Sequence, residues 1–167
     1  MSGNNKKAVW KLGDHINTDL IYPSRYLYES QAPEVLASHV MEPLIPDYRN
    51  AIETGDYLVA GENFGCGSSR EQAVTALKFA GCGGIIAKSF SRIFYRNCIA
   101  LGLASIVCPE AVDALETGDK IQVDLKAGKI IHADKTYHFA MFGDYVGGII
   151  ESGGLIPFLK KRVTDLI

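Results

Sequence analysis

The order of apolar and polar positions predicts alternating strands and helices in the middle of the chain. Residues 57–60, 84–87 and 104–107 are short, continuous apolar runs of the kind that forms buried strands. Each pair of successive runs is separated by a helical pattern. Apolar side chains lie three and four positions apart over residues 70–80 and again over residues 90–101, as they do in helices. This alternation indicates an α/β protein with a mainly parallel sheet.

The N-terminal side of this centre adds a strand, a loop and a helix. Apolar side chains alternate over residues 8–12, which predicts a first strand. Residues 13–23 are rich in Gly, Asp, Asn and Pro, so they predict a loop that includes a short strand. Residues 33–41 predict a helix, because a proline suits its first turn and Pro43 prevents its continuation.

The C-terminal side adds a helix over residues 109–116 and a hairpin over residues 120–133 that turns at residues 127–128. The apolar, glycine-rich residues 146–161 predict one or two helices packed against the rest of the protein. The letters ETGD precede both the strand at 57–60 and the hairpin, so both should start from the same kind of turn. The flanking residues differ, which excludes a repeat architecture.

Length and charge narrow the class of protein. The 167 residues are enough for one core, so we expect a single domain over residues 1–167, with residues 1–7 as a flexible tail. A net charge of -2 and scattered basic residues disfavour nucleic acid as a partner. The N-terminus lacks a signal sequence and no apolar run is long enough to span a membrane, so we expect a cytoplasmic protein.

The cysteines argue against a metal site in this chain. Cys66, Cys82, Cys98 and Cys108 are widely separated and form no C-x-x-C pair, so neither a zinc site nor a self-contained iron-sulfur site is indicated. Cys82 and Cys98 lie in apolar surroundings, where a free cysteine acts as a small buried hydrophobe. We therefore expect no metal ligands here.

The segment GENFGCGSSRE, residues 61–71, is the strongest candidate site. It joins a strand to a helix and so collects backbone N–H groups, the positive end of a helix dipole and the side chains of Ser68, Ser69 and Arg70. Gly67 allows close backbone approach, and a guanidinium binds carboxylates in two-pronged fashion. These features predict an anion-binding site.

Other interpretations of this segment stay open at this point. Ser68 or Ser69 could simply cap the helix, with Glu71 in its first turn. A phosphate site is disfavoured because the lysine of a nucleotide-binding loop is missing, so a carboxylate is the better candidate. A hydrolase nucleophile is disfavoured because Ser68 is not in a G-x-S-x-G motif and no histidine is spaced as its base.

Two further segments carry polar side chains that could meet a ligand. Asp14, Asp19 and Arg25 fall in or beside the turn-rich loop, where the alternative is an ordinary turn with a surface ion pair. Arg92 and Arg96 lie four residues apart at the start of a predicted helix, where Ser89 or Ser91 could be the cap, and would form a solvated basic face.

Four motifs together resemble a known family. GDHINTDLI, GENFGCGSSRE, KSFSRIFYRN and ESGGLIPFLKK, in this order over residues 8–161, resemble the small subunit of 3-isopropylmalate dehydratase, itself similar to the swivelling domain of aconitase. The resemblance implies a three-layer β/β/α swivelling domain and a hydro-lyase of leucine biosynthesis. It also implies a large partner subunit that holds a [4Fe-4S] cluster. A homo-oligomer in isolation is compatible with it.

The resemblance also implies roles for single residues. Ser68 matches the serine that takes and returns the proton next to a carboxylate, in a dehydration and rehydration through a cis-alkene diacid. Arg70 matches an arginine that binds substrate. Other positions match substrate-binding or supporting residues: Arg25, Ser69, Gly67, Tyr28, Asp14 and Glu71.

Two departures from the family pattern leave the substrate open. Gln72 stands where many relatives have histidine, and Tyr28 stands where relatives have an aliphatic residue or an arginine. An aromatic residue suits an alkyl group, and Glu29 would repel a third carboxylate, so we favour an alkyl-substituted malate. The alternatives are a subunit for homoaconitate, methylmalate or dimethylmalate, a non-catalytic carboxylate-binding regulatory module, and a catabolic pathway.

Overall fold

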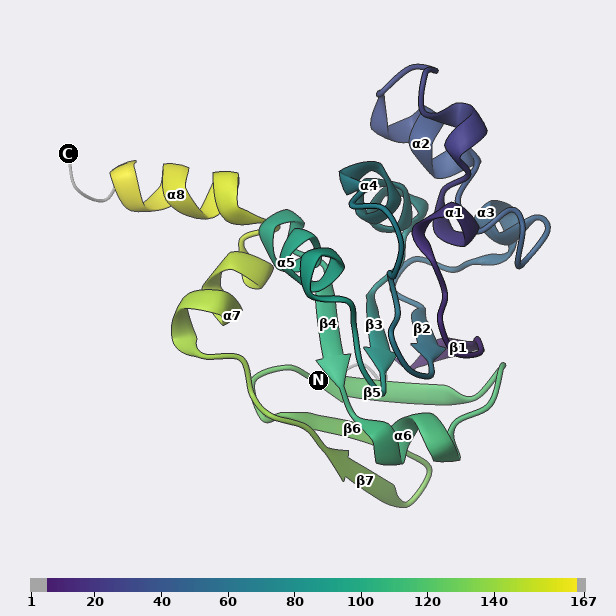
Figure 1. The fold of residues 1–167 in the computed structure, drawn as a ribbon. Helices are drawn as coiled ribbons and strands as arrows, with labels where there is room; N and C mark the ends of the chain where they lie inside the picture. The colour runs from purple at the N-terminus through teal and green to yellow at the C-terminus, as the bar shows by residue number, and fades with distance from the viewer. Residues whose placement is uncertain (1–5, 165–167) are drawn as a thin grey trace.

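A seven-stranded sheet forms the centre of the protein in the computed structural model, which describes residues 6–164 (Figure 1). The strand order is β4-β3-β2-β1-β5-β6-β7; the first four strands are mutually parallel and the last three antiparallel. The strands are β1 (Lys7–Lys11), β2 (Tyr57–Ala60), β3 (Gly84–Ala87), β4 (Ala104–Val107), β5 (Lys120–Asp124), β6 (Lys129–His132) and β7 (Lys135–His138).

Eight α-helices and one 3-10 helix are present among the described residues. Helices α4 and α5 follow β2 and β3 and cross back to the next parallel strand, as right-handed β-α-β units require. The helices are α1 (Thr18–Ile21), η1 (Ser24–Tyr26), α2 (Pro33–Ser38), α3 (Tyr48–Ala51), α4 (Glu71–Ala80), α5 (Arg92–Leu101), α6 (Pro109–Ala114), α7 (Asp144–Glu151) and α8 (Leu155–Thr164).

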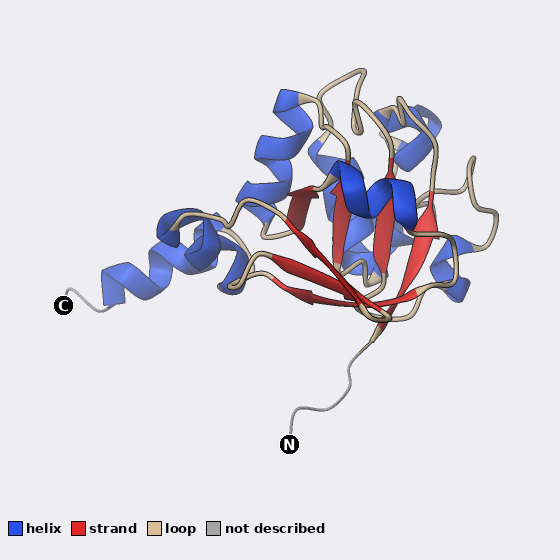
Figure 2. Cartoon of the chain, turned by 90° about the horizontal axis from the view of Figure 1, so that it is seen from below, coloured by secondary structure: helices blue, strands red, loops and turns tan. Residues whose placement is uncertain are grey.

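Two apolar cores separate three layers. Alternate residues of the parallel strands face opposite sides, so Leu58 and Ile85 pack toward helices α2, α4 and α5, whereas Val59 and Ile86 pack against the antiparallel strands. The antiparallel strands β5–β7 run across the direction of β2–β4 (Figure 1), and Figure 2 shows the two halves of the sheet facing each other. The predicted β/β/α architecture is confirmed.

The two ETGD turns start strands β2 and β5 in the same way, as predicted. In the first, a side-chain oxygen of the buried Asp56 accepts from the Glu53 backbone N–H at 3.1 Å. In the second, Asp119 accepts from the Glu116 N–H at 2.8 Å. Asp56 also accepts from the Ala8 N–H at 2.8 Å, so this turn fixes the neighbouring strand β1.

The strands at 57–60, 84–87 and 104–107 and the hairpin of β5 and β6 are confirmed, and the predicted helices are found with ends shifted by up to three residues. Lys7 belongs to β1, so the predicted tail is one residue too long; residues 1–5 of that tail lie outside the described part. The loop over 13–23 contains helix α1 and an isolated bridge at Asn17 instead of the predicted short strand, and η1, α3 and β7 were not predicted.

The prediction that the C-terminal end packs down is wrong for α8. The start of this helix meets α5 and α7, and Phe158 packs on Tyr145, but none of its described residues is buried, and Ile156, Leu159 and Val163 are exposed. In Figure 1 it projects from the rest of the protein. No helix within residues 6–164 is long and apolar enough to cross a membrane.

Candidate active site

The segment between β2 and α4 is held in place by backbone hydrogen bonds to two other loops. The Gly65 N–H donates to the Ile16 carbonyl at 2.7 Å, and the Thr18 N–H donates to the Cys66 carbonyl at 3.0 Å. On the other side, the Ser91 hydroxyl donates to the Gly65 carbonyl at 2.7 Å. The segment therefore lies between the N-terminal loop and the start of α5.

Gly65 is required by this packing. Its φ of +77° is in the left-handed region, and a Cβ atom added there would lie 2.1 Å from Cγ of Phe94. Phe94 is buried on α5 and also packs on Phe64, with ring centroids 5.4 Å apart. A side chain at position 65 would thus push α5 away from the segment.

A cavity of about 240 Å³ opens where this segment meets α5. The N-termini of two ten-residue helices, α4 and α5, border it, so the positive ends of two helix dipoles lie beside one space. The lining residues come from three parts of the chain: Thr18; Gly65, Gly67, Ser68, Ser69 and Arg70; Ser91, Arg92, Ile93 and Phe94. This arrangement favours an anionic ligand.

The two serines are not helix caps. The N-cap residue of α4 is Arg70, and no side chain accepts a hydrogen bond at this end of the helix, so the capping interpretation of Ser68 and Ser69 is wrong. Both serines are exposed. The backbone N–H groups of residues 67–70 donate to no backbone carbonyl within residues 6–164. They remain available to a ligand.

Arg70 is mostly buried and already paired. Its Nη1 and Nη2 atoms donate to the two carboxylate oxygens of Asp19 at 2.6 and 3.1 Å, and Nη1 also lies 3.4 Å from the Tyr22 carbonyl. Hydrogen bonds from Arg70 and, to a smaller extent, from Ser24 lower the pKa of Asp19 to about 2. The surface ion pair suggested among Asp14, Asp19 and Arg25 is therefore not formed between these residues: Asp19 pairs with Arg70 and Arg25 pairs with Glu42.

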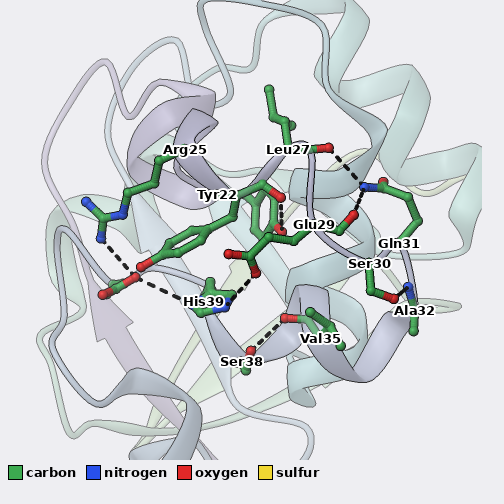
Figure 3. Close-up of polar contacts among 12 residues, drawn as sticks. Tyr22, Arg25, Leu27, Glu29, Ser30, Gln31, Ala32, Val35, Ser38 and His39 are labelled. Carbon is green, nitrogen blue, oxygen red and sulfur yellow. Dashed lines mark hydrogen bonds and ion pairs between the residues drawn. The ribbon is translucent and has the colours of Figure 1, made fainter.

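The other predicted site residues lie outside the cavity lining. The Asp14 carboxylate accepts from the Glu62 N–H at 2.7 Å, which fixes the start of the segment. Arg25 pairs with Glu42 at 3.1 Å (Figure 3), Tyr28 is 98% exposed, and Glu71 is exposed in the first turn of α4. The structure thus brings Gly67, Ser68, Ser69 and Arg70 together and leaves Asp14, Arg25, Tyr28 and Glu71 outside the cavity lining.

The sequence interpretation missed part of the cavity. Ser89 or Ser91 was expected as a helix cap, and Ser91 is the cap, since it accepts from the Phe94 N–H at 3.4 Å; Arg92 and Arg96 are exposed as expected. Tertiary contacts, among them the one between residues 65 and 91, show that the start of α5 also borders the site. The sequence did contain a signal for this: the predicted helix over residues 90–101 also begins with serine and arginine, just as the segment before α4 ends with them.

The described residues do not fit an iron-sulfur cluster. No three His, Cys, Asp or Glu side chains within residues 6–164 are grouped to hold a metal. Burial raises the pKa of Cys82 to about 11 and that of Cys98 to about 12, so both thiols stay protonated near neutral pH. Both cysteines are buried hydrophobes, as predicted.

Comparison with known proteins identifies the family. Residues 14–111 match the model of the aconitase C-terminal domain, so the chain belongs to that family. It is 49% identical over 160 residues to the 3-isopropylmalate dehydratase small subunit of Caldicellulosiruptor bescii, covering 95% of this chain and 96% of the relative. The chain is a hydro-lyase small subunit of the isopropylmalate dehydratase family, which confirms the resemblance predicted from its motifs.

Two further relatives bear on fold and substrate. The methanogen homoaconitase small subunit of Methanothermobacter thermautotrophicus is 47% identical over 165 residues, covering 98% of this chain and 95% of the relative. The crystal structure of a 3-isopropylmalate dehydratase from Methanocaldococcus jannaschii superposes with a TM-score of 0.89 at 42% identity, and the match covers 96% of each chain. The family therefore includes relatives named for different substrates.

Proposed function

We propose that this chain is the small subunit of a two-subunit 3-isopropylmalate dehydratase. A large partner subunit would hold the [4Fe-4S] cluster, since the cysteines of this chain do not fit one. The observation that supports this most is the cavity in which Ser68, Arg70 and the N-termini of α4 and α5 meet. The names of relatives with 42 to 49% identity support the substrate class.

In this proposal Ser68 removes the proton next to a substrate carboxylate. A serine hydroxyl is a weak base in water, so its anion must be stabilised in the site. The N–H groups of residues 67–70, two helix dipoles and the positive charge of Arg70 supply that stabilisation. Loss of the proton and of the neighbouring hydroxyl gives a cis-alkene diacid and water, and rehydration in the opposite sense gives the isomer.

Arg70 can bind a substrate carboxylate without releasing Asp19. A guanidinium has five N–H donors. Asp19 and the Tyr22 carbonyl use both hydrogens on Nη1 and one on Nη2, which leaves the Nε hydrogen and one Nη2 hydrogen. These two form a second fork that suits a carboxylate. Asp19 then orients Arg70, while Ser69 and Gly67 add donors beside the same ligand.

A subunit for homoaconitate is the second candidate, because one relative with 47% identity has that name. A third carboxylate would need a cation near the segment over residues 26–29. Arg25, the cation next to that segment, is paired with Glu42. Tyr28 is exposed there and offers an aromatic surface to an alkyl group. This arrangement favours the alkylmalate over the tricarboxylic acid.

The test is to assemble the chain with a large subunit of the family and measure kcat/KM for 3-isopropylmalate, methylmalate, dimethylmalate and homoaconitate. We expect 3-isopropylmalate to be the best substrate. Faster turnover of homoaconitate than of any alkylmalate would contradict the substrate assignment. Absence of turnover in a fully assembled complex that retains its cluster, with carboxylates still bound, would favour a regulatory module instead.

A further inference from the structure

The segment that precedes α2 is joined to the candidate active site at both of its ends. At its start, the Tyr22 carbonyl accepts from Arg70. At its end, the Gln72 side chain donates to the Gln31 side chain at 3.2 Å. Arg70 and Gln72 are the residues just before and just inside α4. Residues 25–29 lie between these two hydrogen bonds. A contact that fixes the conformation of residues 25–29 therefore also fixes part of the surroundings of the site.

The middle of this segment is only lightly anchored by apolar side chains: Tyr26 and Leu27 pack against the core but are only partly buried. Within residues 24–31 no side chain is buried, and Arg25, Tyr28 and Glu29 are exposed. The Glu29 N–H donates to the Tyr26 carbonyl at 3.1 Å, and the Gln31 side chain donates to the Glu29 carbonyl at 3.1 Å. These are bonds within the segment. They shape it but do not place it on the rest of the protein.

His39 adds an attachment at Tyr26 and ties down the exposed Glu29 (Figure 3). Its ring stacks on the Tyr26 ring, with centroids 3.7 Å apart and planes inclined by 15°. Its Nε2 atom lies 3.4 Å from the Glu29 carboxylate, and its Nδ1 atom lies 3.8 Å from the Glu42 carboxylate. Glu42 in turn pairs with Arg25 at 3.1 Å. One imidazole thus contacts the segment directly twice and a third time through Glu42.

The backbone that carries His39 is fixed by the core. The two residues that follow it, Val40 and Met41, are 2% and 0% exposed, and the Met41 N–H donates to the Ile21 carbonyl at 2.8 Å. Ala37, two positions before it, is also buried. A side chain on such a fixed backbone can hold a loosely packed segment in one conformation.

We propose that His39 is a positioning residue for substrate selection. By holding Glu29 and Tyr26, it keeps a carboxylate away from the substrate and leaves Tyr28, which is 98% exposed, as the side chain that meets the variable group of the substrate. The inference rests on the proposed function, because it concerns the substrate group that distinguishes an alkylmalate from a tricarboxylic acid. His39 itself takes no part in proton transfer.

The experiment compares His39→Ala with His39→Gln in the assembled complex. For His39→Ala we expect KM for 3-isopropylmalate to rise about tenfold with kcat within about twofold, because loss of positioning weakens binding of the alkyl group but not proton removal. His39→Gln can still donate to Glu29 and should recover part of the KM. Glu34→Gln, an exposed charge change on helix α2, which directly precedes His39, is the matched control and should leave both constants unchanged.

A second measurement on the full-length small subunit does not depend on substrate. In His39→Ala, hydrogen exchange of the Glu29 amide should accelerate about tenfold or more, while that of the Ser91 amide, which donates to the Phe64 carbonyl, should not change. Unchanged KM and unchanged exchange would overturn the inference, and so would equal losses of kcat for every substrate. If the wild-type complex turned over none of the diacids, the proposed function would fail instead.

Discussion

The active-site segment over residues 61–70 and the segment over residues 22–31 lie next to each other but are held by different means. The first is fixed by backbone hydrogen bonds on both sides and by Gly65, at which no side chain fits. The second is held by side chains, through His39, Gln72 and Arg70. Side chains change by single substitutions and backbone geometry does not. The reaction site therefore depends mainly on backbone contacts, and the neighbouring segment depends mainly on side chains that a single substitution can change.

Among the tests of this comparison, Gly65→Ala is expected to have the largest effect, a loss of folding stability. The new methyl group would collide with Phe94, and the φ of +77° would be strained, so we expect a loss of about 3 kcal/mol of folding stability. Gly143→Ala is the control, because a Cβ atom there has open space and its φ is negative. Denaturant unfolding measures both. Equal stability of the two variants would show that the segment is not fixed by this contact.

Arg70→Lys tests the residue that joins the two segments. Lysine lacks the two pairs of N–H donors with which a guanidinium can bind Asp19 and a substrate carboxylate at once. We therefore expect kcat/KM to fall about 100-fold, mostly through a higher KM. Arg96→Lys, a change of the same kind on the exposed face of α5, should have an effect below about twofold. If both variants kept wild-type kcat/KM, Arg70 would not bind the substrate.

Tyr28→Arg tests whether the neighbouring segment selects the substrate. An added cation should favour a third carboxylate, so the ratio of kcat/KM for homoaconitate to that for 3-isopropylmalate should rise about tenfold. Folding stability should not change, because the side chain is almost fully exposed. A constant ratio would place the variable group of the substrate elsewhere.

The smallest effect concerns the pH dependence of the Asp19–Arg70 pair. The pKa of Asp19 in the folded protein, about 2, lies below its ordinary value of 3.8, so the pair stabilises the fold above about pH 4 and loses this effect as the pH falls toward 2. Since Asp19 is half exposed, we expect Asp19→Asn to cost about 0.5 to 1 kcal/mol at pH 7. The difference from wild type should shrink by roughly half at pH 3 in denaturant titrations. A difference that did not depend on pH would exclude this pair as its cause.

The sequence predicted the repeated elements of the fold better than its irregular parts. The strand at Tyr57–Ala60 was recognisable because a continuous apolar run is bounded by polar turns. Helix α1 was missed because its four residues are too few to show a helical period. The packing of α8 was predicted wrongly, because an apolar pattern in a sequence does not show whether another part of the protein covers it.

The candidate site shows the same division. The turn between β2 and α4 was predicted from local glycine and serine chemistry, and the family resemblance named Ser68 and Arg70. The pairing of Arg70 with Asp19 joins residues 51 positions apart, and the contact of Ser91 with Gly65 joins residues 26 positions apart. Such contacts depend on how the elements pack, which local patterns in a single sequence do not show.

The central claim is that Ser68 moves the proton, and solvent exchange into the substrate tests it most directly. The assembled complex is incubated with 3-isopropylmalate in deuterium oxide, and incorporation at the carbon next to the carboxylate is followed by NMR. For Ser68→Ala we predict incorporation slowed by about 1,000-fold or more with KM nearly unchanged. Ser38→Ala, an exposed serine on α2, should match wild type. Incorporation at the wild-type rate in Ser68→Ala would contradict the account.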